Sequence, residues 1–107
     1  LIIGSPTRGF RPTKDITALL DNIPAGALNG GKTAAFDTRI STADVKSRFL
    51  NGMVRVFGYA AEPIAAKLRK KGGKEIISPE GFYVQDSEGP LKDGEIERAV
   101  AWARQLY

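Results

Sequence analysis

The sequence predicts an α/β fold in which helices cover a parallel β-sheet. Strand-like apolar runs alternate with helical patterns, and the connections between strands are long enough to hold helices. The first run, residues 1–3, passes straight into the turn residues Gly4-Ser5-Pro6-Thr7, as a buried parallel strand does where it ends. A second run contains Ala34 and Ala35, small residues that suit a strand covered on both faces.

The turn after Ile3 is the stretch around which the rest of the chain is organised. Open α/β sheets bind their ligands beyond the carboxyl ends of the strands. Small residues and hydroxyls there let backbone N–H groups approach a planar or anionic ligand closely. The simpler alternative is a tight turn that only leads into a helix. Because no turn precedes the first apolar run, we expect this strand to begin upstream, in a longer protein.

A helix is predicted after this turn, and a second strand after the helix. Thr13 is a suitable N-cap, and Pro24 stops the helix. The positions expected to face the core are Ile16, Leu19, Leu20 and Ile23. Residues 32–39 then form a strand whose polar end, Asp37-Thr38-Arg39, is expected beside the first loop. Two adjacent parallel strands that end in polar loops form a crevice, which predicts a ligand site.

The pattern of residues 41–73 indicates one weak and one clear helix. Residues 41–57 predict a short helix or an ordered insertion. The clear helix starts near Ala60 or Ala61, so that Pro63 lies in its first turn, and it stops at Gly72-Gly73. Its apolar stripe consists of Ala61, Ile64, Ala65 and Leu68.

The last third of the chain predicts a strand and a helix. The strand covers residues 75–78, and residues 82–84 continue it or pair beside it after a Pro79-Glu80-Gly81 turn. The final helix begins at Asp93 or Gly94. Its expected core-facing residues are Ile96, Ala99, Val100, Ala103 and Leu106, with Trp102 on a flank.

Composition excludes several classes of function. Cys and His are absent, which excludes disulfides, thiolate nucleophiles, Ser-His-Asp triads and the commonest zinc ligands. Any chemistry must use carboxylates, lysine, tyrosine or a borrowed cofactor, and the cofactor is favoured. We therefore predict neither catalytic residues nor metal ligands. No apolar run reaches membrane-spanning length and no signal-peptide pattern is present, so we expect a cytoplasmic protein.

The net charge of +4 is unevenly distributed. Residues 44–74 hold eight basic and two acidic side chains, whereas residues 75–107 hold three basic and seven acidic ones. The basic segment suits nucleic acid or an acidic protein partner. A solvated helix face is the favoured interpretation, because the lysines cluster at a predicted helix end, where the helix dipole favours positive charge.

Five stretches together resemble the flavodoxin-like family. They are Gly4-Ser5-Pro6-Thr7-Arg8-Gly9, Phe36-Asp37-Thr38-Arg39, Gly58-Tyr59-Ala60-Ala61, Pro79-Glu80-Gly81-Phe82, and the segment 88–95, which reads Glu-Gly-Pro-Leu-Lys-Asp-Gly-Glu. The resemblance implies a three-layer α/β/α sandwich with a parallel sheet of order 2-1-3-4-5. Residues 1–107 would form a single, partial domain that carries the last three strands and lacks the first two.

The resemblance also implies a bound FMN. In the family, the first of these stretches opens the loop that lies against the isoalloxazine ring. The cofactor-binding residues carried over are Ser5, Pro6, Thr7, Arg8, Gly9 and Phe10 in the first loop and Asp37, Thr38 and Arg39 in the second. Arg39 near the ring would stabilise anionic reduced flavin. Tyr59 would edge the flavin, although an ordinary half-buried tyrosine is the favoured interpretation of that residue.

The chain departs from the family in one respect. No stretch matches the Ser/Thr/Gly-rich loop that holds the FMN phosphate at a helix N-terminus. The first strand would then be an exposed hydrophobic sheet edge. The missing N-terminal strands are expected in cis, in which case the chain is a fragment. The alternatives are that another chain supplies these strands, or that flavin binding has been lost.

The leading functional expectation is electron transfer, or part of a flavin-dependent reductase. Its partner would be a redox protein or an NAD(P)H-linked reductase, although a pI near 9.6 departs from the acidic electron carriers of the family. The main alternative is a flavin-free binding module that uses residues 44–74 on an acidic protein or, less favoured, on nucleic acid. A phosphorylated receiver domain ranks last, because Asp37 stands alone. A hydrolase is disfavoured by the lack of His and Cys.

Overall fold

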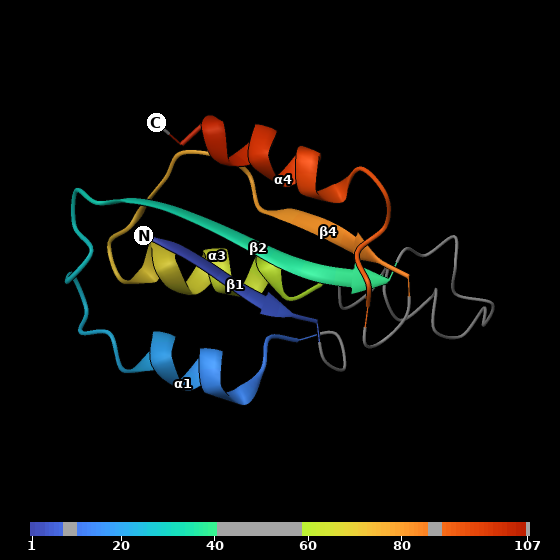
Figure 1. Ribbon diagram of the computed structural model, residues 1–107. Helices are drawn as coiled ribbons and strands as arrows, with labels where there is room; N and C mark the ends of the chain where they lie inside the picture. Colours follow the sequence, from blue (N-terminus) through green and yellow to red (C-terminus); the bar gives the residue numbers. More distant parts are fainter. Residues whose placement is uncertain (8–10, 41–58, 86–88, 107) are drawn as a thin grey trace.

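A computed structural model describes residues 1–7, 11–40, 59–85 and 89–106. Within them the chain forms an α/β fold with a mostly parallel sheet and helices on both faces (Figure 1). The elements are β1 (Ile2–Pro6), α1 (Lys14–Asp21), β2 (Lys32–Ile40), α3 (Ala61–Lys70), β3 (Lys74–Glu75), β4 (Glu80–Val84) and α4 (Glu95–Arg104). The predicted α/β class is therefore confirmed. The short helix or insertion expected at 41–57 lies outside the described residues.

Strand β2 is the centre of the sheet. On one side it pairs in parallel with β1, so that Ile2 lies opposite Ala34 and Pro6 lies opposite Thr38. On its other edge it pairs in parallel with β3 near its start and with β4 over residues 36–40. Strands β1, β2 and β4 therefore run in the same direction and end at the same end of the sheet, the carboxyl edge, which Figure 1 shows as arrowheads pointing the same way.

The predicted third strand over residues 75–78 is wrong in its extent. Strand pairing stops at Glu75 and resumes at Glu80, on the same edge of β2. The backbone N–H of Ile76 still donates to the carbonyl of Thr33 at 3.3 Å, and the chain then leaves the ladder. Pro79 lies in this interruption, where its missing N–H costs no ladder hydrogen bond. Residues 80–84 thus continue the interrupted strand, one of the two alternatives expected.

Helices α1 and α3 cover one face of the sheet. Thr13 is the N-cap of α1, as predicted, and accepts a hydrogen bond from the backbone N–H of Ile16. The predicted stripe of α3 is confirmed, because all four of its members are buried. The core on this face consists of Ile3, Leu20, Ala35, Ile64, Ala65 and Leu68. One predicted core position is wrong: Leu19 is 51% exposed.

Helix α4 covers the opposite face, and the aromatic residues there form the second core. The rings of Phe36, Phe82 and Trp102 meet edge to face, with centroids about 6 Å apart. The predicted orientation of α4 is wrong in part: Trp102 is buried, whereas Ile96 and Val100 are 63% and 46% exposed. Ala99, Ala103 and Leu106 pack against the aromatic cluster as predicted.

Two of the glycines in this framework have different roles, close packing at Gly4 and a left-handed backbone at Gly72. Gly4 lies under the ring of Phe36, and a side chain at this position would overlap that ring. Gly72 has a φ of +98° just after α3, which is the left-handed stop predicted from the sequence.

A carboxylate on α4 ties this helix to β4. Glu95 is buried and accepts hydrogen bonds from the backbone N–H of Tyr83 at 2.7 Å and from Arg98 Nη2 at 2.7 Å. Arg98 also pairs with Glu80 at 3.1 Å and donates to the carbonyl of Gly81. The hydrogen bond from Arg98, helped by the N–H of Tyr83, lowers the pKa of Glu95 below its ordinary value of 4.5.

We expect this carboxylate to make stability depend on acid. A lowered pKa in the folded protein means that the unfolded chain binds the proton more tightly. The contribution of Glu95 to stability is therefore complete above pH 4.5, and it is lost as the pH falls through the pKa of Glu95 in the folded protein. Urea unfolding at several pH values should show the wild type to be more stable than Glu95→Gln near neutral pH. The two free energies of unfolding should become equal in acid. Glu97→Gln, at an exposed position, is the control. If the difference in the free energy of unfolding between the wild type and Glu95→Gln stayed the same in acid, the prediction would be wrong.

Candidate functional site

The loops after β1 and β2 lie side by side at the carboxyl edge of the sheet. Ser5 is opposite Asp37 in the ladder, and the backbone N–H of Thr7 donates to the carbonyl of Thr38 at 3.0 Å. The start of α3 joins them, because the N–H of Ala60 donates to Thr7 Oγ1 at 3.2 Å. Three segments far apart in the sequence therefore meet at one point, which we call the edge site (residues 5–7, 37–39 and 59–61).

A buried ion pair lies at the centre of the edge site. The Asp37 side chain is fully buried, and its two oxygens accept hydrogen bonds from Arg39 Nε and Nη2, both at 2.6 Å. Oδ2 of Asp37 also accepts from the backbone N–H of Ala61 at 2.9 Å. The carboxylate thus joins β2 to the N-terminus of α3, where the helix dipole favours a negative charge. The bidentate geometry fixes the plane of the guanidinium.

The guanidinium of Arg39 lies over the ring of Tyr59. Its central carbon is 3.8 Å from the ring centroid, a cation–π contact. Burial raises the pKa of the Tyr59 hydroxyl, and the positive charge of Arg39 opposes that effect. The side chain of Arg39 is 17% exposed, so this stacked pair reaches the surface at the carboxyl edge. A flat cation supported by an aromatic ring is suited to a planar ligand with anionic or carbonyl oxygens.

Ser5 has an internal role. It is buried, its hydroxyl donates to the carbonyl of Pro6 at 2.8 Å, and it accepts from the backbone N–H of Thr13 at 3.0 Å. These bonds connect the end of β1 to the start of α1. The ligand contact predicted for Ser5 stays a prediction.

The structure brings most of the predicted site residues together. Ser5, Pro6, Thr7, Asp37, Thr38, Arg39 and Tyr59 all belong to the edge site, whereas Arg8, Gly9 and Phe10 lie outside the described residues. Pro6 is exposed, and Thr7, Thr38 and Tyr59 are half-buried. No sequence pattern pointed to the backbone N–H groups of Ala60 and Ala61 as parts of the site. The i, i+2 spacing of Asp37 and Arg39, which places both on one face of a strand, was the available signal for their pairing.

Two other kinds of site receive no support from the described residues. Across residues 1–7, 11–40, 59–85 and 89–106, no three Asp or Glu side chains gather as metal ligands would. In the same parts of the chain, none of the helices has the length and apolar character needed to cross a bilayer.

A second concave surface, the α4 groove, lies between β1 and α4. It has a volume of about 430 Å³, and its apolar lining includes Ile2, Phe36, Phe82, Leu91, Ile96 and Val100. Among the described residues, β1 pairs only with β2, so its other edge has no strand partner, and Ile2 of β1 lines the groove. An exposed hydrophobic sheet edge was expected at the first strand if the two N-terminal strands are missing. That such strands pair there, in cis or from another chain, stays a prediction.

No protein-family model, curated protein or solved structure matched the chain. A function must therefore be inferred from the geometry of the edge site.

Proposed function

We propose that the chain is an FMN-binding, flavodoxin-like domain that serves electron transfer or a flavin-dependent reductase. The proposal is supported chiefly by one observation: the loops after β1 and β2 lie side by side and hold the stacked Arg39–Tyr59 pair at the carboxyl edge. This is the edge at which parallel α/β sheets bind ligands. The flavin would supply the redox chemistry when bound, and the protein would bind and orient it.

The residues at the edge site suit a flavin ring. Arg39 offers a positive charge for the carbonyl side of the ring, and Tyr59 packs against one face of the planar guanidinium. On the neighbouring loop, the backbone N–H of Thr7 donates to the carbonyl of Thr38, and Thr7 Oγ1 accepts from the N–H of Ala60. With Arg39 near the ring, its charge would favour the anionic reduced form. The proposed partner that delivers or removes electrons is a redox protein or an NAD(P)H-linked reductase.

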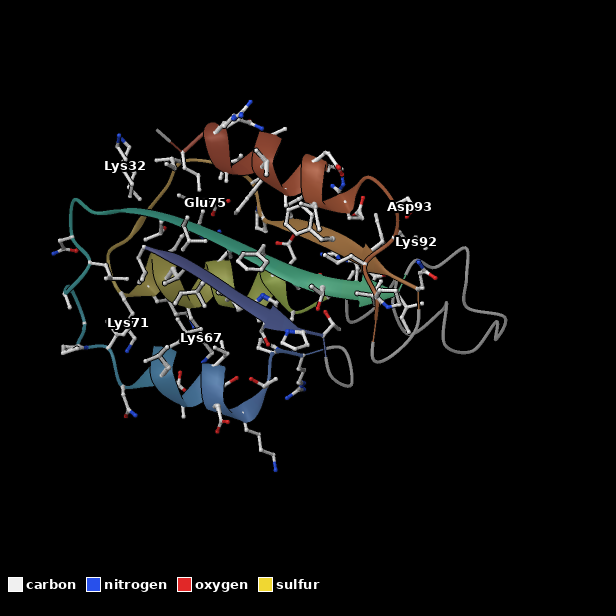
Figure 2. The ribbon with its side chains drawn as sticks, viewed as in Figure 1. Lys32, Lys67, Lys71, Glu75, Lys92 and Asp93 are labelled. Carbon is white, nitrogen blue, oxygen red and sulfur yellow. The ribbon has the colours of Figure 1, made fainter. Side chains whose placement is uncertain are left out.

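The alternative, a binding module that uses basic residues 44–74, receives less support. Only residues 59–74 of that segment are described. Lys67 forms an ion pair with Asp21 at 2.6 Å, and Arg69 forms one with Glu75. Figure 2 shows Lys67 and Lys71 lying between α3 and α1, where Lys71 Nζ donates to the carbonyl of Asp21. These cations connect elements of the fold, which agrees with the favoured interpretation of a solvated helix end.

A flavin titration tests the proposal. We expect the fluorescence of FMN to be quenched on adding the full chain, with saturation at one flavin per protein. Arg39→Lys keeps a positive charge for Asp37 but loses the planar, bidentate fork, so it should weaken FMN binding about tenfold. The control is Arg69→Lys, because Arg69 also forms an ion pair but lies at the far end of α3. This control should bind FMN as the wild type does.

Two outcomes would contradict the proposal. The first is the absence of quenching by folded wild-type protein, with folding checked by circular dichroism. The second is quenching by the wild type with the same change in FMN affinity for Arg39→Lys and for Arg69→Lys. That result would place the flavin away from the edge site.

A further inference from the structure

The side-chain space of one glycine in β4 is occupied by a residue of β2. Gly81 lies opposite Asp37 in the ladder, so both residues face the same side of the sheet, as does Arg39, two residues further along β2. A Cβ atom placed on Gly81 would overlap Nε, Cζ and Nη2 of Arg39. The guanidinium of Arg39 thus lies directly on the backbone of β4.

Both faces of this guanidinium are therefore covered. The ring of Tyr59 lies over one face, with 3.8 Å between its centroid and Cζ. Gly81 covers the other face, because the three atoms nearest to its missing side chain span the guanidinium plane and the ring already fills the first side. Nε and Nη2 are bound to Asp37 in that plane. A ligand therefore meets the guanidinium at its remaining edge, where N–H groups donate in the plane.

The backbone of Gly81 is held in place from the opposite face of the sheet. Its carbonyl accepts a hydrogen bond from Arg98 Nη2, and the same nitrogen donates to Glu95 Oε2 at 2.7 Å. The N–H of Tyr83, two residues further along β4, also donates to Glu95, at 2.7 Å. Helix α4 thus fixes the part of β4 on which the guanidinium lies.

A side chain at position 81 would displace the guanidinium and not the strand. The backbone of Gly81 is fixed by the ladder with β2 and by α4, whereas the end of an arginine side chain can move. Asp37 is fully buried and cannot follow the guanidinium outward. The displacement would therefore leave a buried carboxylate without its counter-ion, which is strongly destabilising.

We propose that Gly81 is a positioning residue of the edge site. Its lack of a side chain lets Arg39 lie flat between β4 and Tyr59, paired with Asp37 and with its free edge toward a ligand. The identity of that ligand, a flavin, rests on the proposed function. The positioning itself can be measured on the protein without a ligand.

Urea unfolding in two backgrounds tests the positioning. In the wild type, Gly81→Ala should lower the urea midpoint by about 1 M, because it separates Arg39 from Asp37. The second background, Asp37→Asn with Arg39→Ala, has neither the guanidinium nor the buried charge. There Gly81→Ala should leave the midpoint unchanged or raise it, because alanine costs less conformational entropy on folding than glycine. Equal losses in the two backgrounds, or no loss in the wild type, would overturn the inference.

Hydrogen exchange of the Arg39 Nε proton, followed by NMR, gives a second readout. In the wild type this proton lies in a 2.6 Å hydrogen bond to a buried carboxylate, so it should exchange slowly with water. In folded Gly81→Ala it should exchange rapidly. Slow exchange in that variant would mean that the guanidinium keeps its place without the glycine.

Gly31→Ala is the control for the glycine-to-alanine change itself. Gly31 precedes β2 at the other end of the sheet, and among the described residues a Cβ there would approach only the carbonyl of Leu28, whose oxygen is 3.1 Å away. In titrations of the full chain with FMN, Gly81→Ala should weaken binding about tenfold, and Gly31→Ala should bind as the wild type does.

The outcomes separate the two proposals. If the folded wild type binds no FMN, the proposed function fails, and the urea midpoints and the exchange of the Nε proton still decide the role of Gly81. If Gly81→Ala displaces Arg39 but binds FMN normally, the flavin lies away from Arg39, and the claim that Gly81 serves the ligand site is overturned.

Discussion

Replacing Asp37 with asparagine is expected to lower the free energy of unfolding by about 3 kcal/mol, the lower end of the range for breaking a buried ion pair. The carboxylate is fully buried and accepts three hydrogen bonds, two from Arg39 and one from Ala61. Asparagine has one acceptor oxygen and no charge, so it leaves the guanidinium without its counter-ion. The loss stays near the lower end because the Arg39 side chain retains 17% exposure to water.

Urea unfolding measures this difference, and Asp21→Asn is the matched control. Asp21 also forms an ion pair at 2.6 Å, with Lys67, but its side chain is 55% exposed. Solvent screens such a pair, so the control should unfold near the wild-type midpoint. Equal midpoints for Asp37→Asn and Asp21→Asn would mean that the buried pair does not hold the edge site together.

This prediction joins stability to the proposed function. Asp37 fixes Arg39 against Tyr59 and also holds the first turn of α3, so one side chain sets the shape of the edge site. Asp37→Asn should therefore weaken flavin binding even under conditions in which the variant is folded. A variant that is less stable but binds FMN normally would assign Asp37 to folding alone.

The sequence predicted the edge site through backbone patterns. A strand that ends in small and polar residues, followed by a helix, places both loops at one edge whatever the side chains do. Of the contacts within the site, the pairing of Asp37 with Arg39 had a signal in their i, i+2 spacing, whereas the hydrogen bond from Ala61 to Asp37 had none. Asp37 was expected to face a ligand. In the structure its buried carboxylate pairs with Arg39 and accepts a hydrogen bond from the backbone N–H of Ala61, at the start of α3. That contact depends on how closely α3 approaches β2, which no local pattern records.

The orientation of α4 shows a second limit of sequence patterns. Periodicity counts apolar residues equally, so it placed Ile96 and Val100 toward the core. In the fold the large ring of Trp102 packs against both Phe36 and Phe82, which also contact each other, and determines the buried face of the helix. Ile96 and Val100 then line the α4 groove together with Ile2 of β1.

Adjacent leucines on α1 provide a direct test of helix orientation, because the apolar spacing placed both in the core. Leu20 is fully buried in the cluster with Ile3, Ile64 and Leu68, whereas Leu19 is 51% exposed. We expect Leu20→Ala to lower the free energy of unfolding by about 3 kcal/mol, within the range for a cavity left by a buried leucine. Leu19→Ala should change it by less than about 0.5 kcal/mol.

The two leucine variants are controls for each other. They make the same chemical change, one residue apart, and alanine favours the helix equally at both positions. A difference in urea midpoint between them therefore reports burial alone. Equal losses in the free energy of unfolding would mean that both leucines face the sheet. The orientation of α1, and with it the hydrogen bond from the N–H of Thr13 to Ser5 Oγ, would then be wrong. A larger loss for Leu20 would support the packing of α1 against the core of Ile3, Ile64 and Leu68.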